Sequence, residues 1–556
     1  MTLTVRRRDE DGLVAFTNPH RELLAHDPES ALAALDAAEA ALREGYWIAG
    51  YLCYELGAAF VKGPQRPTLR PLLHLGAFDA PRPERDADRP FTLSPLFPLI
   101  DEEAYAAAID AIHARIYDGE VYQVNYTVPY ALRVLGDAAS LWGAIAQATG
   151  ARYQALVEDD AGFLLSWSPE LFLEFDGERI RTRPMKGTAP IDDVAQLESA
   201  KNRAEHVMIV DLLRNDLRRV CDDVDVEALC TIESYPRFAT MTSTIGGTVR
   251  PDATLRDIFA ATFPCGSITG APKRAAYATI HALEPQTREA YCGAIGSLSP
   301  QRRGWWNVAI RTAQIDRDGY GRFDAGGGIV IDSDARAEWN EIALKTAFLD
   351  RFATPLELWE TLASDADADT LDAHLARLRA TARRFRLEFN EALLRDALGD
   401  AAARSGVHTL VRVRLRADGT FTVATEPMAP PGSPAPICLS NIRVRSDDPL
   451  LAIKTAWRPA ADAAMKVALA RRCFDALLCN ERGELTEGSR TNLFVEISGT
   501  LFTPPLVCGL LPGILRSRLV SEGRVEERAI TPADLTAADA IYVGNSARGL
   551  VPARLV

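Results

Sequence analysis

The segment Arg183-Pro-Met-Lys-Gly-Thr-Ala-Pro190 follows two short runs with the pattern of strands, Gly162-Phe-Leu-Leu-Ser-Trp167 and Leu171-Phe-Leu-Glu-Phe175. Its Lys186 is one of only seven lysines among the 62 basic residues of the chain. A guanidinium stays protonated, whereas a desolvated lysine amine can lose its proton and act as a nucleophile. A genome-wide bias toward arginine also explains why lysine is rare, but not why most of the remaining lysines lie in motifs.

A hairpin signal precedes this lysine. Asp176-Gly177 is typical of a two-residue turn, and it predicts that Glu170 faces Arg183 across the ladder. Lys186 lies three residues beyond that pair, so we expect Glu170 and Lys186 to converge on one substrate. A carboxylic acid beside a nucleophilic amine suits displacement of a hydroxyl, because the acid can protonate the leaving oxygen. A salt bridge at the strand end, between Glu170 and a neighbouring base, is the alternative.

Strand and helix patterns mix along the whole chain. A long helical pattern covers residues 198–218, close to the strand-like runs, which predicts mixed α and β layers. In the second half, Val411-Arg-Val-Arg-Leu-Arg416 alternates with a period of two and ends at Asp418-Gly419, a second hairpin signal. We therefore expect an α+β protein.

A domain boundary is expected near Phe352, where a helical pattern ends and Pro355 opens a new alternation. The prediction is one domain over residues 1–352 and another over residues 353–556. Pro427-Met-Ala-Pro-Pro-Gly-Ser-Pro-Ala-Pro436 reads as an ordered connector within the second domain.

Composition excludes several functional classes. The 556 residues carry a formal net charge of -14 without a long basic run, which argues against a nucleic-acid partner. The nine cysteines are odd in number and contain no Cys-x-x-Cys, so neither a disulfide framework nor a zinc ribbon is indicated. With no signal-peptide pattern and no 18-residue apolar stretch, we expect a cytoplasmic protein that does not insert into membranes.

A helix after Asp332-Ser-Asp334 would place Glu338, Glu341 and Lys345 on one face. Glu205, on another helix, adds a third carboxylate. Carboxylate oxygens with few histidines nearby favour magnesium. An exposed Glu341–Lys345 ion pair is the simpler alternative for this face.

The run Gly266-Ser-Ile-Thr-Gly-Ala-Pro-Lys273 is a glycine-rich turn that leads into a helix, with Pro272 near its first position. Backbone N–H groups at such a helix start can bind an anion. The spacing differs from a Walker loop, which has four residues between its glycines and a lysine directly after the second. A plain helix-capping turn is the alternative.

These motifs together resemble the chorismate-utilising enzymes, in the family's order over about residues 1–350. The lysine at Lys186 resembles the aminodeoxychorismate branch, because related branches carry alanine there. The resemblance implies layered antiparallel sheets with helices and a reaction of chorismate with ammonia. The matching segments are Ser168-Pro-Glu170, Arg183-Pro-Met-Lys-Gly-Thr188, Ala204-Glu-His-Val-Met-Ile-Val-Asp-Leu-Leu-Arg-Asn-Asp216, Gly266-Ser-Ile-Thr-Gly-Ala-Pro-Lys273 and Ala325-Gly-Gly-Gly328.

The resemblance also implies residue roles. Lys186 would add to chorismate as the 4-hydroxyl leaves, Glu170 would protonate that hydroxyl, and ammonia would then displace the lysine. Gln123 supports ammonia as the nucleophile, since relatives that deliver water carry lysine there. Substrate-binding residues would be Gln123, Ser267, Thr269, Gly270, Tyr291, Arg311, Gly327 and Lys345, and magnesium ligands Glu205 and Glu341 with Glu338 close by.

One position departs from this family. Most members have histidine, near the substrate ring, where this chain has Thr240. The departure puts the rate in question and leaves the type of reaction unchanged.

The second half resembles the class IV pyridoxal phosphate enzymes, whose fold has two lobes. Lys454 matches the lysine that bonds the cofactor, Glu487 the carboxylate that faces its ring nitrogen, and Arg377 the arginine that binds its phosphate. A carboxylate at the nitrogen keeps the ring protonated, so the ring can accept electrons. Taken alone, Lys454 could be a surface lysine at a strand end. Ile514, Leu515 and Ser546 would add further contacts to pyridoxal 5'-phosphate.

The two resemblances together predict a bifunctional folate-pathway enzyme. The first half would make 4-amino-4-deoxychorismate and the second would release pyruvate from it to give 4-aminobenzoate. Ammonia would come from a separate glutaminase subunit or from solution, and a dimer could form through the second half. Two alternatives stay open, namely an anthranilate-type synthase joined to an aminotransferase and a non-catalytic fusion that docks a glutaminase.

Overall fold

The computed structural model describes residues 2–9, 12–190, 194–195, 197, 199–234, 238–406 and 408–556. The chain divides into two compact units, Met1–Ala353 and Thr354–Val556, and each has its own hydrophobic cores. The division lies beside the expected boundary between residues 352 and 353. Over the described residues, no helix is both long enough and apolar enough to span a bilayer.

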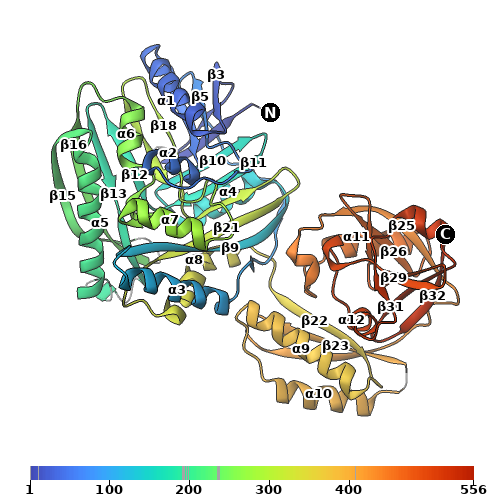
Figure 1. Cartoon of the computed structure of the whole chain (residues 1–556). Helices are drawn as coiled ribbons and strands as arrows, with labels where there is room; N and C mark the ends of the chain where they lie inside the picture. The colour runs from blue at the N-terminus through green and yellow to red at the C-terminus, as the bar shows by residue number, and fades with distance from the viewer. Residues whose placement is uncertain are drawn as a thin grey trace. The chain divides into compact units, whose positions relative to one another are not determined.

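The first unit is built from two large sheets (Figure 1). One sheet has the strand order β17-β9-β21-β20-β11-β10-β1-β2-β6, with β7 and β8 also paired to β9. The other has the order β14-β16-β13-β12-β19-β18-β4-β5-β3, with β15 paired to β16. Buried side chains such as Val5 and Val157 from one sheet cluster with Tyr51 and Ile295 from the other. The sheets therefore face each other across a shared core, as in the expected layered architecture.

The strands of the first unit range from two to 14 residues in length. Their bounds are β1 (Thr4–Asp9), β2 (Gly12–Phe16), β3 (Arg21–Ala25), β4 (Trp47–Leu52), β5 (Leu73–Phe78), β6 (Arg82–Pro83), β7 (Phe91–Leu93), β8 (Phe97–Pro98), β9 (Gln123–Gly136), β10 (Tyr153–Asp159), β11 (Gly162–Ser168), β12 (Leu171–Asp176), β13 (Arg179–Arg183), β14 (Met185–Pro190), β15 (Cys221–Ser234), β16 (Phe238–Val249), β17 (Gly270–Ala271), β18 (Ala294–Leu298), β19 (Arg303–Val308), β20 (Thr312–Ile315) and β21 (Tyr320–Ile329).

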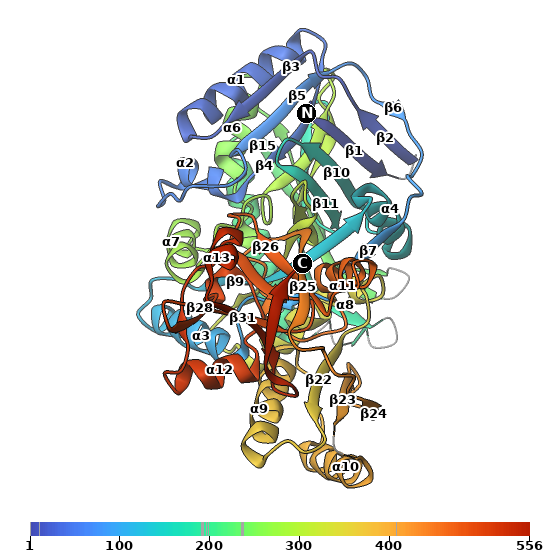
Figure 2. The ribbon, with the colours of Figure 1, turned by 90° about the vertical axis from the view of Figure 1, so that its right-hand side faces the viewer.

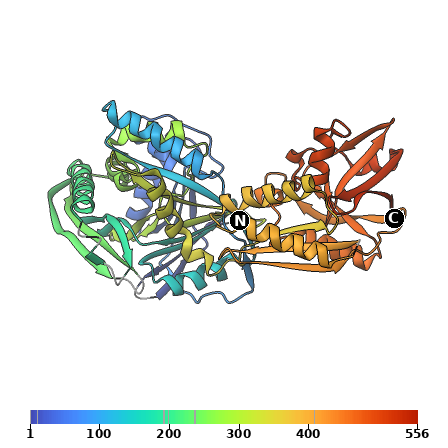
Figure 3. The same cartoon turned by 90° about the horizontal axis from the view of Figure 1, so that it is seen from below.

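Helices cover the sheets of the first unit. Helix α1 packs on β3 and β5 (Figure 2), and α5 packs on β15 and β16 (Figure 3). Most helices begin at an Asp, Ser or Thr whose side chain accepts a backbone N–H of the first turn. Their bounds are α1 (Pro28–Arg43), η1 (Tyr54–Leu56), α2 (Gly57–Val61), α3 (Glu102–Tyr117), α4 (Ala138–Thr149), α5 (Ala200–Arg218), α6 (Leu255–Thr262), η3 (Gly266–Ile268), α7 (Lys273–Leu283) and α8 (Ala335–Asp350).

The predicted register of the β12–β13 hairpin is wrong. Asp176 pairs with Arg179, so the turn residues are Gly177 and Glu178, and Gly177 has a φ of +69° that favours glycine. An irregularity in β12 then brings Leu171, and not Glu170, opposite Arg183. Glu170 therefore lies just before the strand, where its side chain is free of the ladder.

The second unit contains two sheets of its own. The smaller has the order β22-β23-β24, and α9 and α10 pack against it (Figure 1). The larger has the order β27-β26-β25-β32-β31-β28-β29-β30, in which β25 runs parallel to β26 and β32. Helix α11 packs on β25 and β26, and α12 on β31. The two sheets correspond to the two lobes expected from the sequence.

The hairpin predicted at Asp418-Gly419 joins β23 to β24. The elements of this unit are β22 (Glu357–Ala363), α9 (Ala368–Arg384), α10 (Glu391–Arg404), β23 (Thr409–Arg416), β24 (Phe421–Pro427), β25 (Ala435–Val444), η4 (Pro449–Ala452), α11 (Pro459–Ala470), β26 (Asp475–Asn480), β27 (Leu485–Gly488), β28 (Asn492–Ile497), β29 (Thr500–Thr503), η5 (Leu506–Cys508), α12 (Ile514–Ser521), β30 (Glu526–Glu527), α13 (Pro532–Ala537), β31 (Ala540–Asn545) and β32 (Gly549–Leu555).

Candidate active sites

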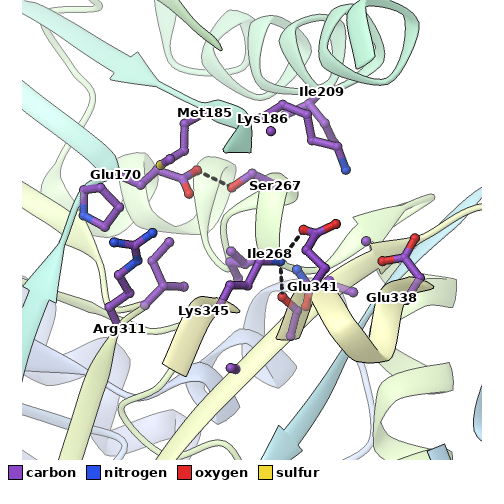
Figure 4. Close-up of a pocket in the computed structure, with 18 of the residues that line it drawn as sticks. Glu170, Met185, Lys186, Ile209, Ser267, Ile268, Arg311, Glu338, Glu341 and Lys345 are labelled. Carbon is purple, nitrogen blue, oxygen red and sulfur yellow. Dashed lines mark hydrogen bonds and ion pairs between the residues drawn. The ribbon is translucent and has the colours of Figure 1, made fainter. Parts of the chain in front are cut away.

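A cavity of about 250 Å³ lies in the first unit, and strands β9, β14 and β21 and helices α5 and α8 contribute to its walls (Figure 4). It brings together residues from distant parts of the sequence. The predicted residues on its lining are Gln123, Glu170, Lys186, Glu205, Ser267, Tyr291, Arg311, Gly327, Glu338, Glu341 and Lys345.

Glu170 is a buried acid at one wall of this cavity. Its side chain is 3% exposed, and the Ser267 hydroxyl donates a hydrogen bond of 2.6 Å to Oε1 (Figure 4). Burial raises the pKa of Glu170 to about 7, although Ser267 and then Lys186 act in the opposite direction. Near neutral pH a substantial fraction of Glu170 is therefore protonated and can give a proton to a bound group. Glu170 is therefore held by the hydrogen bond from Ser267, and not by the strand-end salt bridge that was the alternative.

Lys186 lies on β14 and projects toward α5. Its Nζ is 2.7 Å from Glu205 Oε2, and both side chains are partly buried. The following residue is fixed from the neighbouring strand, because the Thr240 hydroxyl donates a hydrogen bond of 2.7 Å to the Gly187 carbonyl. Thr240 is fully buried and is not one of the residues that line the cavity. In this chain the residue at the usual histidine position thus supports the backbone beside Lys186.

Helix α8 carries Glu338, Glu341 and Lys345 toward the same cavity, as the sequence predicts (Figure 4). Lys345 Nζ donates to the Gly326 carbonyl at 2.7 Å and lies 2.9 Å from Glu341. The Ser333 hydroxyl donates to Glu338 at 2.8 Å. Over the described part of the chain, no three metal-ligating side chains already form a cluster. The carboxylates have the chemistry that magnesium requires, but each is engaged by a side chain of the protein.

Two predicted substrate residues lie behind the cavity wall. Thr269 and Gly270 are not on the lining, and the Thr269 hydroxyl donates to the Cys265 carbonyl at 2.9 Å. Three polar lining residues, Asn125, Asn202 and Asp324, escaped the sequence reasoning. Asn125 lies two residues after Gln123, and Asp324 directly precedes Ala325-Gly-Gly-Gly328, so these two had a positional signal. Burial raises the pKa of Asp324 to about 6.

A second cavity, of about 310 Å³, lies in the second unit. Burial lowers the pKa of Lys454 to about 8, although Glu360 acts in the opposite direction. Arg412 and Arg458 also line this cavity and contribute to the lowering. The predicted residues on its lining are Arg377, Lys454, Glu487, Ile514 and Ser546, whereas Leu515 is buried behind it.

Glu360 organises one side of this second cavity. Its carboxylate accepts hydrogen bonds from Arg377 at 2.8 and 2.7 Å and lies 2.6 Å from His374 Nδ1. His374 Nε2 is in turn 2.8 Å from the Ser546 hydroxyl, and Lys454 Nζ is 4.0 Å from Glu360. Although burial opposes ionisation, Arg377 and His374 hold the pKa of Glu360 well below its usual range. Neither Glu360 nor His374 was predicted as a site residue, although His374 lies only three residues before Arg377.

Glu487 lies on β27, in the larger sheet of this unit. Its Oε1 accepts from the Leu511 backbone N–H at 3.1 Å, and its Oε2 from the Asn492 side chain at 3.2 Å. Burial raises the pKa of Glu487 to about 7. Helix α12 begins at Ile514 after Gly513, which supplies no side-chain cap, so its first N–H groups are available to an anion.

The comparisons with known proteins agree with this division. Residues 3–351 match the family model described as chorismate binding enzyme, and residues 361–556 match the model described as amino-transferase class IV. Aminodeoxychorismate synthase component 1 from Klebsiella aerogenes is 38% identical over 253 residues, which are 44% of this chain and 56% of that protein. Anthranilate synthase component 1 from Arthrobacter globiformis is 34% identical over 263 residues, 44% of this chain and 49% of that protein.

The chain spans about half the length of the curated relatives it matches. Among solved structures, anthranilate synthase component I from Streptococcus pneumoniae TIGR4 has a TM-score of 0.53 at 20% identity, covering 63% of this chain and 92% of that one. This likeness establishes the fold of the first unit. The chain belongs to the chorismate binding enzyme family and carries a class IV aminotransferase domain fused behind its chorismate binding domain.

Proposed function

We propose that the first unit converts chorismate and ammonia into 4-amino-4-deoxychorismate and water, and that the second eliminates pyruvate from this product to give 4-aminobenzoate. One observation carries the first half of the proposal. A lysine that can become a nucleophile and a buried acid with a pKa of about 7 line the same cavity. The match to aminodeoxychorismate synthases supports the choice of substrate.

The first reaction requires Lys186 as a free amine, so Lys186 must first leave Glu205 and lose its proton to solvent water. Its nitrogen forms a bond to the ring, the bond from C4 to the hydroxyl oxygen breaks, and Glu170 gives its proton so that water leaves. Ammonia then forms a bond to C4, the bond to Lys186 breaks, and the amine is regenerated. A proton from the new ammonium group restores Glu170. The acid lowers the barrier only where it is protonated, as its raised pKa allows.

Magnesium fits the hard oxygen ligands at this cavity, and we propose that Glu205 and Glu341 would hold it, with Glu338 nearby. A bound magnesium ion would neutralise a carboxylate of the substrate and act as a Lewis acid. Arg311 and Lys345 add positive charge to the same cavity. The site therefore suits a substrate with more than one carboxylate.

Pyridoxal phosphate fits the second cavity on three observations. First, Lys454 is buried and its pKa is lowered. Second, Glu487 is a buried carboxylate whose pKa is raised to about 7. Third, helix α12 begins without a side-chain cap, so its first N–H groups are free to donate beside Arg377. We propose that Lys454 would hold the cofactor aldehyde and Glu487 its ring nitrogen. Arg377, Ile514 and Ser546 would bind its phosphate, and Leu515 would contribute only its backbone N–H, because its side chain is buried behind the cavity. When bound, the cofactor accepts the electron pair left as a proton leaves the substrate.

In this second reaction Lys454 takes the proton from C4 of the amino compound. The bond from the ring to the enolpyruvyl oxygen breaks, and a proton reaches the methylene carbon of the leaving group, so that pyruvate is released. Glu360 accepts two hydrogen bonds from Arg377, and His374 is hydrogen-bonded to Ser546, so both residues are held in place. Pyruvate release needs no keto acid acceptor, whereas an aminotransferase does.

Two relatives are named component 1 of aminodeoxychorismate synthase, which implies that a second component exists. We propose that this second component is a separate glutamine amidotransferase that supplies the ammonia. The test is an assay of the purified chain with chorismate, ammonium chloride, magnesium and pyridoxal phosphate. We expect equal amounts of 4-aminobenzoate and pyruvate. Formation of anthranilate would contradict the first half, and conversion that requires a keto acid would contradict the second.

A further inference from the structure

Arg288 lies behind the first cavity, in the connection between α7 and β18. Its side chain is buried at 2% exposure, and its guanidinium pairs with the carboxylate of Glu284, which is 5% exposed. Nε lies 2.9 Å from Glu284 Oε2, and Nη2 lies 2.7 Å from Glu284 Oε1. A buried charge is costly without such a partner. The pair therefore holds a guanidinium in the interior of the first unit.

The other hydrogen bonds of Arg288 join two segments of the cavity wall. Nη1 donates to the Ile268 carbonyl at 2.9 Å, and Nη2 donates to the Asn125 carbonyl at 2.6 Å. Ile268 ends the η3 turn and Asn125 lies on β9, and both residues line the cavity. Glu284 adds a further contact with the strand, because its Oε1 accepts from the Thr127 backbone N–H at 3.0 Å. One buried ion pair thus fastens the turn to the strand.

The η3 turn carries the group that contacts the acid. Ser267 precedes Ile268, and its hydroxyl donates the hydrogen bond of 2.6 Å to Glu170 (Figure 4). The turn has only three residues and no side-chain cap at its start, so its position depends on contacts with neighbouring segments. Lys186, and not Arg288, is the charged group that acts on the pKa of Glu170. Any effect of Arg288 on Glu170 therefore passes through the turn.

We propose that Arg288 is a positioning residue for the first reaction, which holds the η3 turn against β9 so that the Ser267 hydroxyl reaches Glu170. This inference rests on the proposed function, in which Glu170 is the acid. A guanidinium suits the role because its donors form a planar fork that meets the Glu284 carboxylate and both carbonyls at once. A lysine ammonium keeps the charge, but it is too compact to span the same acceptors.

The test is the pH profile of chorismate consumption by Arg288→Lys, Ser267→Ala and the double variant. Ser267 favours the charged form of Glu170, so loss of its hydrogen bond raises the pKa of Glu170 and moves the fall in rate to higher pH. We expect Arg288→Lys to move this fall in the same direction, by about one pH unit. The double variant should move it no further than Ser267→Ala alone.

Three results would overturn the inference. Additive shifts in the double variant would show that Arg288 does not act through Ser267. An unchanged profile of Arg288→Lys would show that the turn keeps its place without the guanidinium, and a fall at lower pH would show that water enters instead. The other ionisable groups beside Glu170 are the same in all of these variants, and they are Lys186, Cys265 and Arg311.

Arg70→Lys is the matched control. Arg70 is also a buried arginine, at 5% exposure, and its Nη1 lies 3.0 Å from Asp159. Its Nη2 donates to the carbonyls of Ala161 and Phe163 at 3.4 and 3.3 Å, and none of these residues lines the first cavity. Arg70→Lys should lower the Tm as Arg288→Lys does, but it should leave the pH profile unchanged. An equal shift in both variants would show a general loss of packing and would contradict a positioning role.

A readout without turnover separates this inference from the proposed function. Infrared titration can follow the protonated carboxyl of Glu170, which is identified by its loss in Glu170→Gln. If chorismate is not converted but this carboxyl titrates at higher pH in Arg288→Lys, the proposed function fails and the positioning role stands. Conversion with an unchanged titration overturns the positioning role alone, and absence of both overturns both. If Arg288→Lys does not fold, Glu284→Asp replaces it, because it keeps the ion pair but withdraws the carboxylate by one methylene.

Discussion

The two cavities prepare a lysine in different ways. In the first, Lys186 forms an ion pair of 2.7 Å with Glu205. In the second, Lys454 lies 4.0 Å from Glu360, and burial lowers its pKa to about 8. Lys186 is therefore in direct contact with a carboxylate, whereas Lys454 lies farther from its carboxylate and is desolvated. The difference predicts that the two reactions can be disabled independently.

The largest expected effect is at Lys186. Lys186→Arg keeps a positive charge beside Glu205, but its guanidinium cannot attack carbon. Lys186→Ala removes both the charge and the nucleophilic amine. We expect either variant to lower chorismate consumption with ammonia at least about a thousandfold. Chromatography of chorismate measures this loss, and mass spectrometry of the unmodified chain should detect a substrate adduct. Full turnover by the arginine variant would rule out a covalent role.

Lys454→Ala should stop the second reaction to a similar degree and leave the first intact. The variant should consume chorismate, accumulate 4-amino-4-deoxychorismate and release no pyruvate. It should also lose the visible absorbance of bound pyridoxal phosphate. Lys466→Ala, on the exposed face of α11, is the matched control and should behave like the unmodified chain. A loss of chorismate consumption in Lys454→Ala would show that the two sites are not independent.

Glu170→Gln should lower the first reaction by about a hundredfold to a thousandfold. Because the protonated acid is the active form and its pKa is raised to about 7, the rate should fall as pH rises through that value. Ser267→Ala removes a hydrogen bond that favours the charged form, so it should move this fall to higher pH. Initial rates from pH 5 to 9 measure both effects. A pH profile unchanged by Ser267→Ala would contradict the role of Glu170 as the acid.

The sequence predicted the two lysines, the acids around them and the layered fold, because each lies in a motif with characteristic spacing. It missed the partners that motifs do not specify. Glu205 could be recognised as a carboxylate, but its contact with Lys186 depends on how α5 packs beside β14. Glu360 pairs with Arg377 across separate elements, and no local pattern reveals this. The hairpin register failed because the turn begins at Gly177, and because β12 has an irregularity between Leu171 and Glu174.

The smallest expected effect distinguishes two interpretations of α8. Glu341 is more than half exposed in its pair with Lys345, so the pair itself should stabilise the fold by at most about 1 kcal/mol. Glu341→Gln should therefore leave the Tm nearly unchanged. If Glu341 is also a magnesium ligand, Glu341→Gln should need several-fold more magnesium for half-maximal consumption of chorismate. EDTA should stop the consumption of chorismate, but it should leave the release of pyruvate from added 4-amino-4-deoxychorismate unaffected. An unchanged magnesium requirement would show that Glu341 is not a magnesium ligand. Glu205 and Glu338 would then have to hold the metal.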